Sequence, residues 1–203
     1  MKSRFALFAT SYRSAILKAP LRTKMFTNLA IGCLGDFLCQ TTMHYYNFSS
    51  KPSKESEKTT GLDPVRTLRQ GTVSMTLKTV ALHVWLTRAL PWLVVSPKLI
   101  AKPSLNRLAT CLLRVLAHTS ILMPYMTGAT LFGIGSLQTF TLTGGVKNCR
   151  DNFRDGYNLA WMYWPLIMMG LYYWVPPLYG NLYMDLWNVL WGAIISYVAN
   201  RKH

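Results

Sequence analysis

The chain has 203 residues, enough for one domain, and combines 51% hydrophobic residues with a formal net charge of +15. A strongly basic chain is often a nucleic-acid-binding protein, but here the basic residues are spread over the N-terminus and the loops, and no compact basic domain presents them. This distribution argues against nucleic acid as a partner. It favours a membrane protein whose basic segments meet anionic lipid headgroups, with cardiolipin as the expected lipid.

The first 24 residues are basic and contain no acidic residue. Their basic residues are Lys2, Arg4, Arg13, Lys18, Arg22 and Lys24. Together with the serines and threonines between them, this composition is typical of a mitochondrial targeting segment. It also fits a membrane-surface helix whose charges keep it on one side of the bilayer. We expect residues 1–24 to form a basic amphipathic N-terminal segment, and both interpretations stay open.

The stretch 156–200 organises the rest of the chain, because it is strongly apolar and carries a single formal charge, Asp185. About 20 apolar residues are enough for a helix to cross a bilayer. The stretch therefore has room for one crossing, a break at Pro176-Pro177 and a second helix. Tyrosines and tryptophans crowd it, as they do at membrane–water interfaces. It is predicted to be a membrane-embedded helical hairpin.

Three further apolar segments precede this hairpin and give it something to pack against. We expect a single all-α domain over residues 25–200, an integral membrane helical bundle of four to five apolar helices. Its predicted elements are a first span at 25–46, a polar linker at 47–66, a second span at 67–95, a third span at 107–140, a polar loop at 141–155 and the hairpin, followed by a basic tail at 201–203. In the linker, Asp63 is expected to cap the next helix, with Pro64 at its first position.

Asp36 is an acidic residue in the middle of the first span, where a charge is costly unless a base or water meets it. We expect a base from the second or third span to pair with it, and the candidates are Lys78, Arg88 and Arg114. The alternative is that Asp36 only caps a helix break after Gly35.

Glycines and prolines within the spans predict close contacts and bends. Gly32 and Gly35 supply a small-residue face for close helix packing. Pro165 frees a backbone carbonyl near Trp161. This predicts a bend between the two residues, with Trp161 and Trp164 at a membrane interface. Alternatively, Pro165 occupies the first turn of a helix that begins near Trp164.

Short motifs follow one another in a fixed order over most of the chain. They comprise Tyr12 and Pro20; Gly32, Gly35, Asp36 and Gln40; Asp63, Arg66 and Arg69 in a D-x-x-R-x-x-R pattern; His83 and Trp85; Pro124 and Gly128; and Trp164-Pro165, Val175-Pro176 and Trp191. Together they resemble the Mpv-seventeen and twenty-two-kilodalton peroxisomal membrane protein family of small helical proteins. The resemblance implies an organelle membrane, which we expect to be the mitochondrial inner membrane, with the peroxisomal membrane as the alternative.

Residues suited to catalysis are sparse in this chain. An enzyme needs a convergent nucleophile, base or metal set, and most of the acidic residues lie in loops or at span ends. His83 and His118 can face each other between the second and third spans, but two histidines make an incomplete metal site. We therefore expect no enzymatic activity, no metal and no cofactor.

The resemblance implies a role linked to pore activity and membrane homeostasis. The candidate polar residues in the spans are Asp36, Gln40, Lys78, His83, Arg88, Arg114 and His118. They can meet as a lumen among the first three helices, or close into a dry network that holds the helices together. The second class of function is an accessory structural subunit of a large inner-membrane assembly, such as a respiratory complex or ATP synthase. Its partners would be lipids and other membrane subunits or further copies of the chain.

Overall fold

The structure is a computed structural model that describes residues 11–12, 14–49, 62–100, 102–175 and 180–200. Every regular element in these ranges is helical, and the described residues contain no strand. The all-α fold predicted from the sequence is therefore confirmed. The predicted basic tail and most of the predicted polar linker lie outside the described residues, as do the first ten residues.

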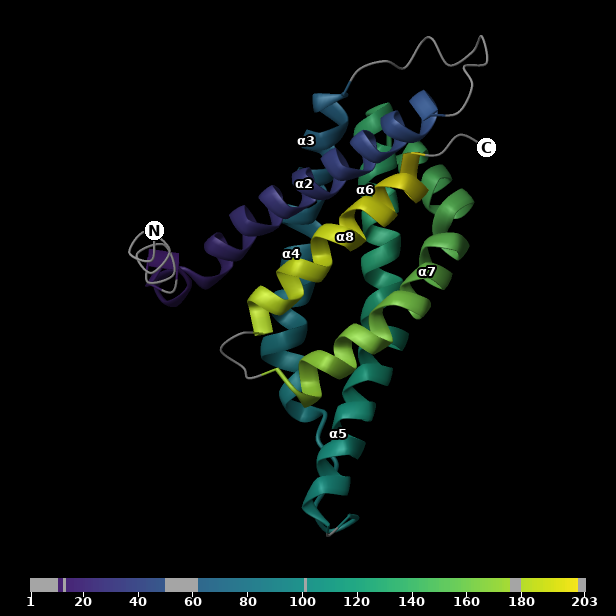
Figure 1. Ribbon diagram of the computed structural model, residues 1–203. Coiled ribbons are helices and arrows are strands. Elements are labelled where there is room, and N and C mark those ends of the chain that lie inside the picture. Colours follow the sequence, from purple (N-terminus) through teal and green to yellow (C-terminus); the bar gives the residue numbers. More distant parts are fainter. Residues whose placement is uncertain (1–10, 13, 50–61, 101, 176–179, 201–203) are drawn as a thin grey trace.

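Five helical rods make up the bundle and run in alternating directions along it (Figure 1). The first is α2 (Pro20–Ser49), and the fourth and fifth are α7 (Leu142–Tyr173) and α8 (Gly180–Asn200). The second rod is built of α3 (Pro64–Val73), η2 (Ser74–Lys78), α4 (Thr79–Val84), η3 (Trp85–Ala89) and η4 (Leu90–Trp92). The third rod is built of α5 (Pro103–Ala117), η5 (His118–Leu122) and α6 (Met123–Thr139).

Helix capping explains where the second rod begins. The side chain of Asp63 accepts a hydrogen bond from the backbone N–H of Arg66, and Pro64 occupies the first helical position. Proline is tolerated there because its missing N–H would have no partner inside the helix. The predicted cap is confirmed.

The predicted polar loop at 141–155 is wrong, because these residues form the first half of α7. Phe140 adopts a left-handed conformation with φ 54°, which ends α6 sharply. Thr141 then caps α7 by accepting a hydrogen bond from the N–H of Gly144. Asn148 of this half faces the bundle, and its amide donates to the Leu131 carbonyl at 2.8 Å. The charged residues Lys147, Arg150, Asp151 and Arg154 lie on the exposed side of the helix.

Three π-helical turns interrupt the second and third rods, namely η2, η3 and η5. The η5 turn lies just before Pro124, which has no N–H and whose ring would clash with the carbonyl four residues earlier in a regular α-helix. A wider turn accommodates this proline without breaking the rod. Lys78 is the last residue of η2 and His118 is the first residue of η5, so both polar side chains lie where the helix is irregular.

Glycines allow α2 to approach two neighbours closely. A Cβ atom added at Gly35 would lie 2.8 Å from the Cα of Gly192 in α8. One added at Gly32 would lie 2.7 Å from the Oγ of Ser74 and 3.0 Å from the Cα of Gly71. Larger residues cannot occupy such crossings unless the backbones move apart. The predicted small-residue contact face is confirmed.

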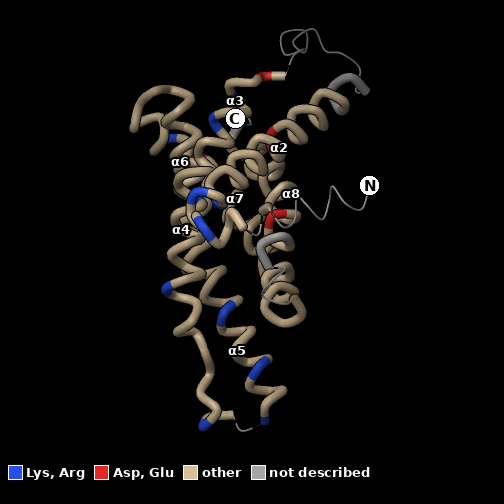
Figure 2. Tube along the Cα trace, turned by 90° about the vertical axis from the view of Figure 1, so that its left-hand side faces the viewer, with Lys and Arg blue, Asp and Glu red and all other residues tan. Residues whose placement is uncertain are grey.

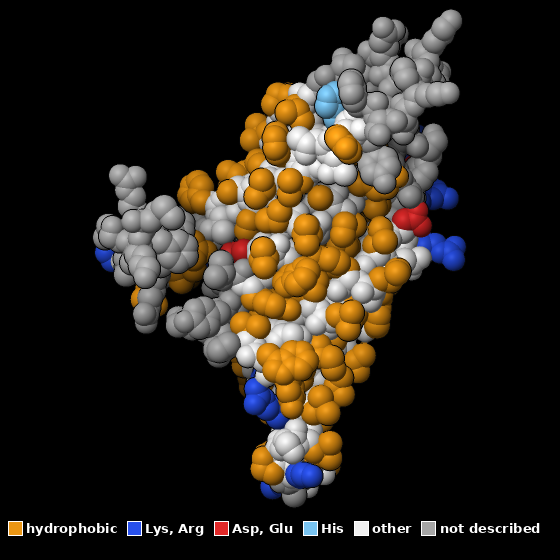
Figure 3. Space-filling view, in the orientation of Figure 1, with side chains coloured by type: hydrophobic (Ala, Val, Ile, Leu, Met, Phe, Trp, Pro, Cys, Tyr) orange, Lys and Arg blue, Asp and Glu red, His pale blue; other side chains and the backbone are white. Residues whose placement is uncertain are grey.

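Apolar side chains cover the outside of the bundle. Phe37 on α2, Val84 and Ile121 on the second and third rods, Leu166 on α7 and Leu186 on α8 are all exposed. Figure 3 shows this apolar surface running over the shaft of the molecule. Basic residues occur at the lower end along α5 and at the upper end around α3 and α7 (Figure 2).

Among the described residues, one helix is both long and apolar enough to cross a membrane, the third rod at Pro103–Thr139. The helical bundle is thus present, whereas the crossing of a bilayer by four or five of its helices stays a prediction.

Candidate functional site

A buried carboxylate lies where α2, α3 and α8 meet. Asp36 has no exposed surface, and its Oδ1 accepts a hydrogen bond from Arg66 Nε at 2.9 Å. The Ser196 hydroxyl of α8 donates to the same oxygen. Thr67 Oγ1 and Gln40 Nε2 donate to Oδ2 at 2.7 and 2.6 Å. We call these five residues the Asp36 cluster, and within it every polar group of the carboxylate is satisfied.

The Asp36 cluster also secures the start of the second rod. Gln40 Oε1 accepts a hydrogen bond from the backbone N–H of Asp63 at 2.6 Å. Asp63 in turn caps α3, which places Arg66 in the first helical turn beside Asp36. The cap and the ion pair therefore depend on each other.

The prediction that a base pairs with Asp36 holds, but the three candidate partners were wrong. The partner is Arg66 rather than Lys78, Arg88 or Arg114. Arg66 is the last residue of the predicted linker, so the expected origin of the base in the second or third span was wrong as well. The capped turn holds Arg66 near Asp36, whereas the other bases lie further along their rods. The alternative of a helix break after Gly35 is also wrong, because α2 runs unbroken through this residue.

A row of inward-facing polar residues continues along the second rod from this cluster. Gln70, Ser74 and Lys78 follow Arg66 at intervals of four residues, which keeps them near one face of a helix. All three are buried. Among the described residues, neither polar atom of the Gln70 amide has a hydrogen-bond partner, nor does the Ser74 hydroxyl. Along this row the side chains thus change, within a few helical turns, from the hydrogen-bonded Arg66 to groups for which the described residues offer no partner.

An inner cavity of about 20 Å³ lies at the end of this row. The second and third rods, α7 and α8 surround it. Its lining residues are Lys78, Leu82, His118, Met123, Met126, Thr127, Trp164, Met184, Asn188 and Trp191. Three polar groups are buried and have no hydrogen-bond partner within the described ranges, namely His118 Nε2, the Thr127 hydroxyl and the Trp164 indole N–H. No acidic residue is among the described lining residues, and the ammonium group of Lys78 has no hydrogen bond or ion pair in the described part of the chain.

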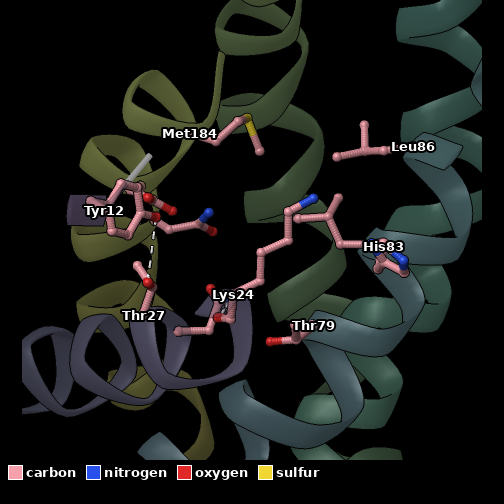
Figure 4. Close-up of a pocket in the computed structure, with 11 residues that line it drawn as sticks. Tyr12, Lys24, Thr27, Thr79, His83, Leu86 and Met184 are labelled. Carbon is pink, nitrogen blue, oxygen red and sulfur yellow. Dashed lines mark hydrogen bonds between the residues drawn. The ribbon is translucent and has the colours of Figure 1, made fainter. Parts of the chain in front are cut away.

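An outer cavity of about 40 Å³ lies next to the inner one. Its lining residues are Tyr12, Lys24, Thr27, Asn28, Thr79, Leu82, His83, Leu86, Met184, Asp185 and Asn188. Figure 4 shows the Lys24 side chain reaching across this space from α2, between Met184 on one side and His83 on the other. The two cavities share Leu82, Met184 and Asn188 as lining residues. Most of the outer lining is half-exposed, whereas almost all of the inner lining is buried.

The remaining residues of the predicted polar set lie elsewhere. Arg88 is exposed, and Arg114 is half-buried with its Nε donating to the Leu93 carbonyl at 3.0 Å. His83 lines the outer cavity and His118 the inner one, so the two histidines do not converge. The described residues contain no group of three or more His, Cys, Asp or Glu side chains placed to hold a metal ion.

The aromatic signature of the C-terminal half forms part of the core. Trp164 is only 2% exposed, and its ring lies 5.8 Å from that of Trp191. The predicted place of Trp164 at a membrane interface is therefore wrong, whereas Trp161 is exposed. Pro165 lies inside α7 and not in its first turn. Pro176 lies outside the described residues.

The other signature residues mark helix starts and contacts. Pro20 begins α2 and Pro124 lies in the first turn of α6. Gly128 faces the ring of Phe153 on α7. Trp85 is buried, with its ring edge-on to that of His118 at 6.1 Å. Arg69 is half-buried in α3.

The sequence analysis missed several polar residues that the fold brings inside. It assigned little to the last helix, yet Asp185 and Asn188 of α8 line the cavities and Ser196 binds Asp36. The reason is the close crossing at Gly35 and Gly192, which draws α8 against α2. Gln70 and Ser74 had a detectable signal, since they continue the four-residue spacing from Arg66 to Lys78.

Polar groups inside and apolar side chains outside define a helical bundle of the kind that membranes accommodate. The chain is 27% identical over 203 residues to PXMP2/4 family protein 1 from Dictyostelium discoideum. The matched region covers 98% of this chain and 87% of that protein. The similarity supports a divergent member of the PXMP2/4 family and confirms the resemblance carried by the motifs. No family model matches the chain, and no solved structure matches it. The similarity to this family and the length and apolar character of the third rod together suggest that the protein associates with a membrane.

Proposed function

We propose that the protein is a non-enzymatic pore of an organelle membrane, through which small polar solutes pass between the helices. The observation that carries this proposal is the pair of adjoining cavities, whose buried polar groups include several without a hydrogen-bond partner in the part of the chain that the structure describes. A buried polar group without a hydrogen bond costs free energy, so such groups are normally satisfied by water or by a ligand. Their presence favours a hydrated interior over a dry one in this part of the bundle.

The size of the cavities indicates a closed state. A cavity needs about 10–15 Å³ to hold one water molecule, so the inner cavity accommodates one or two and the outer cavity a few more. Passage of a solute then requires the helices to separate. The shared lining residues Leu82, Met184 and Asn188 form the boundary that has to open. Met184 is unbranched and Asn188 is small, so both side chains can move aside by changing rotamer.

The compartment is part of the proposal. The basic N-terminal segment favours the mitochondrial inner membrane, whereas the name of the family points to peroxisomes. Cell fractionation of the full chain with markers for both organelles distinguishes the two. Recovery in a soluble fraction would contradict either placement.

A second candidate function is that of an accessory structural subunit of a large membrane assembly. Its support is the extensive apolar surface on every rod and the basic residues at the lower end, which suit neighbouring subunits and anionic lipids such as cardiolipin. Purification in a mild detergent separates the two candidates. A monomer or small homo-oligomer favours the pore, and co-purification with a large complex favours the subunit.

Flux through reconstituted protein tests the pore directly. Glycerol uptake by liposomes, followed by light scattering, is expected to be faster with protein than without it. Leu82→Trp places a large ring at the boundary of the two cavities and is expected to reduce the protein-dependent rate. Leu112→Trp is the matched control, because Leu112 is exposed on the third rod. Equal rates in empty and protein-containing liposomes would contradict the proposed function.

A further inference from the structure

The polar groups around the inner cavity are dominated by hydrogen-bond donors. Lys78 carries an ammonium group that can only donate, and the Trp164 indole N–H likewise only donates. The Thr127 hydroxyl and the Asn188 amide can donate as well. Lys78, Thr127, Trp164 and Asn188 are each at least nine-tenths buried. An arrangement of this kind complements a negative charge, because an anion accepts hydrogen bonds from every side.

The charge balance of the inner cavity points the same way. Lys78 faces it, and none of the described lining residues is acidic. The nearest ion pair of the second rod, Asp36 with Arg66, is already complete within its own cluster. A buried ammonium without a counter-charge is costly, and the same holds inside a membrane. A bound anion would offset that cost and would at the same time satisfy the unpartnered donors.

We propose that the inner cavity binds a small monovalent anion of the size of chloride, held by Lys78 with the Trp164 N–H and the Thr127 hydroxyl as further donors. This rests on the proposed function in one respect, since it names anions as the solutes that the polar interior selects. The cavity of about 20 Å³ sets the size limit. It accommodates a body little larger than a water molecule, which favours a monoatomic anion over a carboxylate.

Chloride-dependent stability of the purified full chain tests the site. The protein is transferred into sodium gluconate, chloride is titrated at constant ionic strength, and thermal unfolding is followed by tryptophan fluorescence. A ligand that binds only the folded state raises the midpoint in a saturable way. We expect this rise in the wild type. In Lys78→Met, which keeps the length of the side chain and removes its charge, we expect the apparent affinity to fall about tenfold to a hundredfold.

Two further variants make the test specific. Arg88→Met removes an exposed cation from the same rod and is expected to leave the chloride effect unchanged. Trp164→Phe keeps an aromatic ring but loses the N–H, and is expected to weaken the effect severalfold. It also carries the test if Lys78→Met does not fold. A wild type without a saturable chloride effect, or variants that all respond as the wild type does, would overturn the proposal.

Acetate provides the comparison of ligand size. Chloride is expected to saturate at a lower concentration than acetate, and the reverse order would overturn the assignment to a monoatomic anion. Glycerol flux keeps the two proposals separate, because glycerol carries no charge. Glycerol flux without chloride binding would overturn the anion site and leave the pore standing. Chloride binding without any flux would uphold the site and contradict the pore.

Discussion

The second rod carries two cations, the half-buried Arg66 and the buried Lys78, whose surroundings differ completely. Arg66 lies against a carboxylate that has four side-chain donors, and its own cluster ties together three helices. Lys78, three helical turns further on, lines a cavity whose described residues include no acid and several unpartnered donors. A complete network is what a structural site requires, whereas an incomplete one is what a site for a solute requires. The comparison predicts that the Asp36 cluster serves stability and that the region around Lys78 serves the proposed function.

Breaking the complete network is expected to have the largest effect on stability. Asp36→Asn keeps the shape of the side chain but leaves Arg66 without a counter-charge inside the bundle. Removal of one partner from a buried ion pair typically costs about 3–5 kcal/mol. We expect a loss of this size in the free energy of unfolding, measured by reversible denaturation in detergent micelles. Asp151→Asn is the control, because Asp151 is exposed on α7. Equal stability of the two variants would show that the Asp36 cluster does not hold the bundle.

The helix crossing beside this cluster is expected to be the next most sensitive position. Gly35→Ala places a Cβ 2.8 Å from the backbone of Gly192, which cannot move aside as a flexible side chain can. Overpacking of this kind costs about 1–3 kcal/mol. Gly128→Ala is a matched control within another helix, since its Cβ would lie 3.5 Å from the Phe153 ring, an ordinary contact. If both variants melt at the same temperature, the close approach of α2 and α8 is not present in the protein.

In the region around Lys78, loss of the charge is expected to change the free energy of unfolding in the opposite direction. Lys78→Met, measured in gluconate without chloride, removes an unpaired buried charge and fills the space with a flexible apolar chain. Replacement of buried charges by apolar residues is often neutral or stabilising. We expect the variant to be at least as stable as the wild type, with a gain of up to about 1 kcal/mol. A loss comparable to that of Asp36→Asn would mean that Lys78 has a structural partner.

The sequence indicated much of the fold and less of the site. Hydrophobic segments placed the helices, the Asp63-Pro64 pair placed the start of the second rod, and the cost of a buried charge required a base for Asp36. The partner itself was missed, because successive residues of a helix differ in direction by about 100°, and the rotation of each rod is set by contacts with distant segments. The role of α8 depends on a crossing of glycines that are far apart in the chain, which no local pattern reveals.

The smallest effect is expected from Gln70→Leu, which is compared with the identical substitution of Gln40 in the Asp36 cluster. Gln40→Leu removes the hydrogen bonds to Asp36 and to the backbone of Asp63, and is expected to cost about 1–3 kcal/mol because buried partners are left unsatisfied. Gln70→Leu removes an amide that has no hydrogen-bond partner among the residues that the structure describes. If water satisfies that amide, as the proposed pore requires, its loss and the gain of an apolar side chain nearly balance, and the free energy of unfolding changes by less than about 1 kcal/mol. In a dry interior the same substitution relieves an unsatisfied amide and stabilises the protein by more than that. Glycerol flux supplies the second measurement. Gln70→Leu replaces one polar side chain of the row by an apolar one and is expected to slow glycerol uptake. A variant that is more stable than the wild type and has unchanged flux would contradict a hydrated interior.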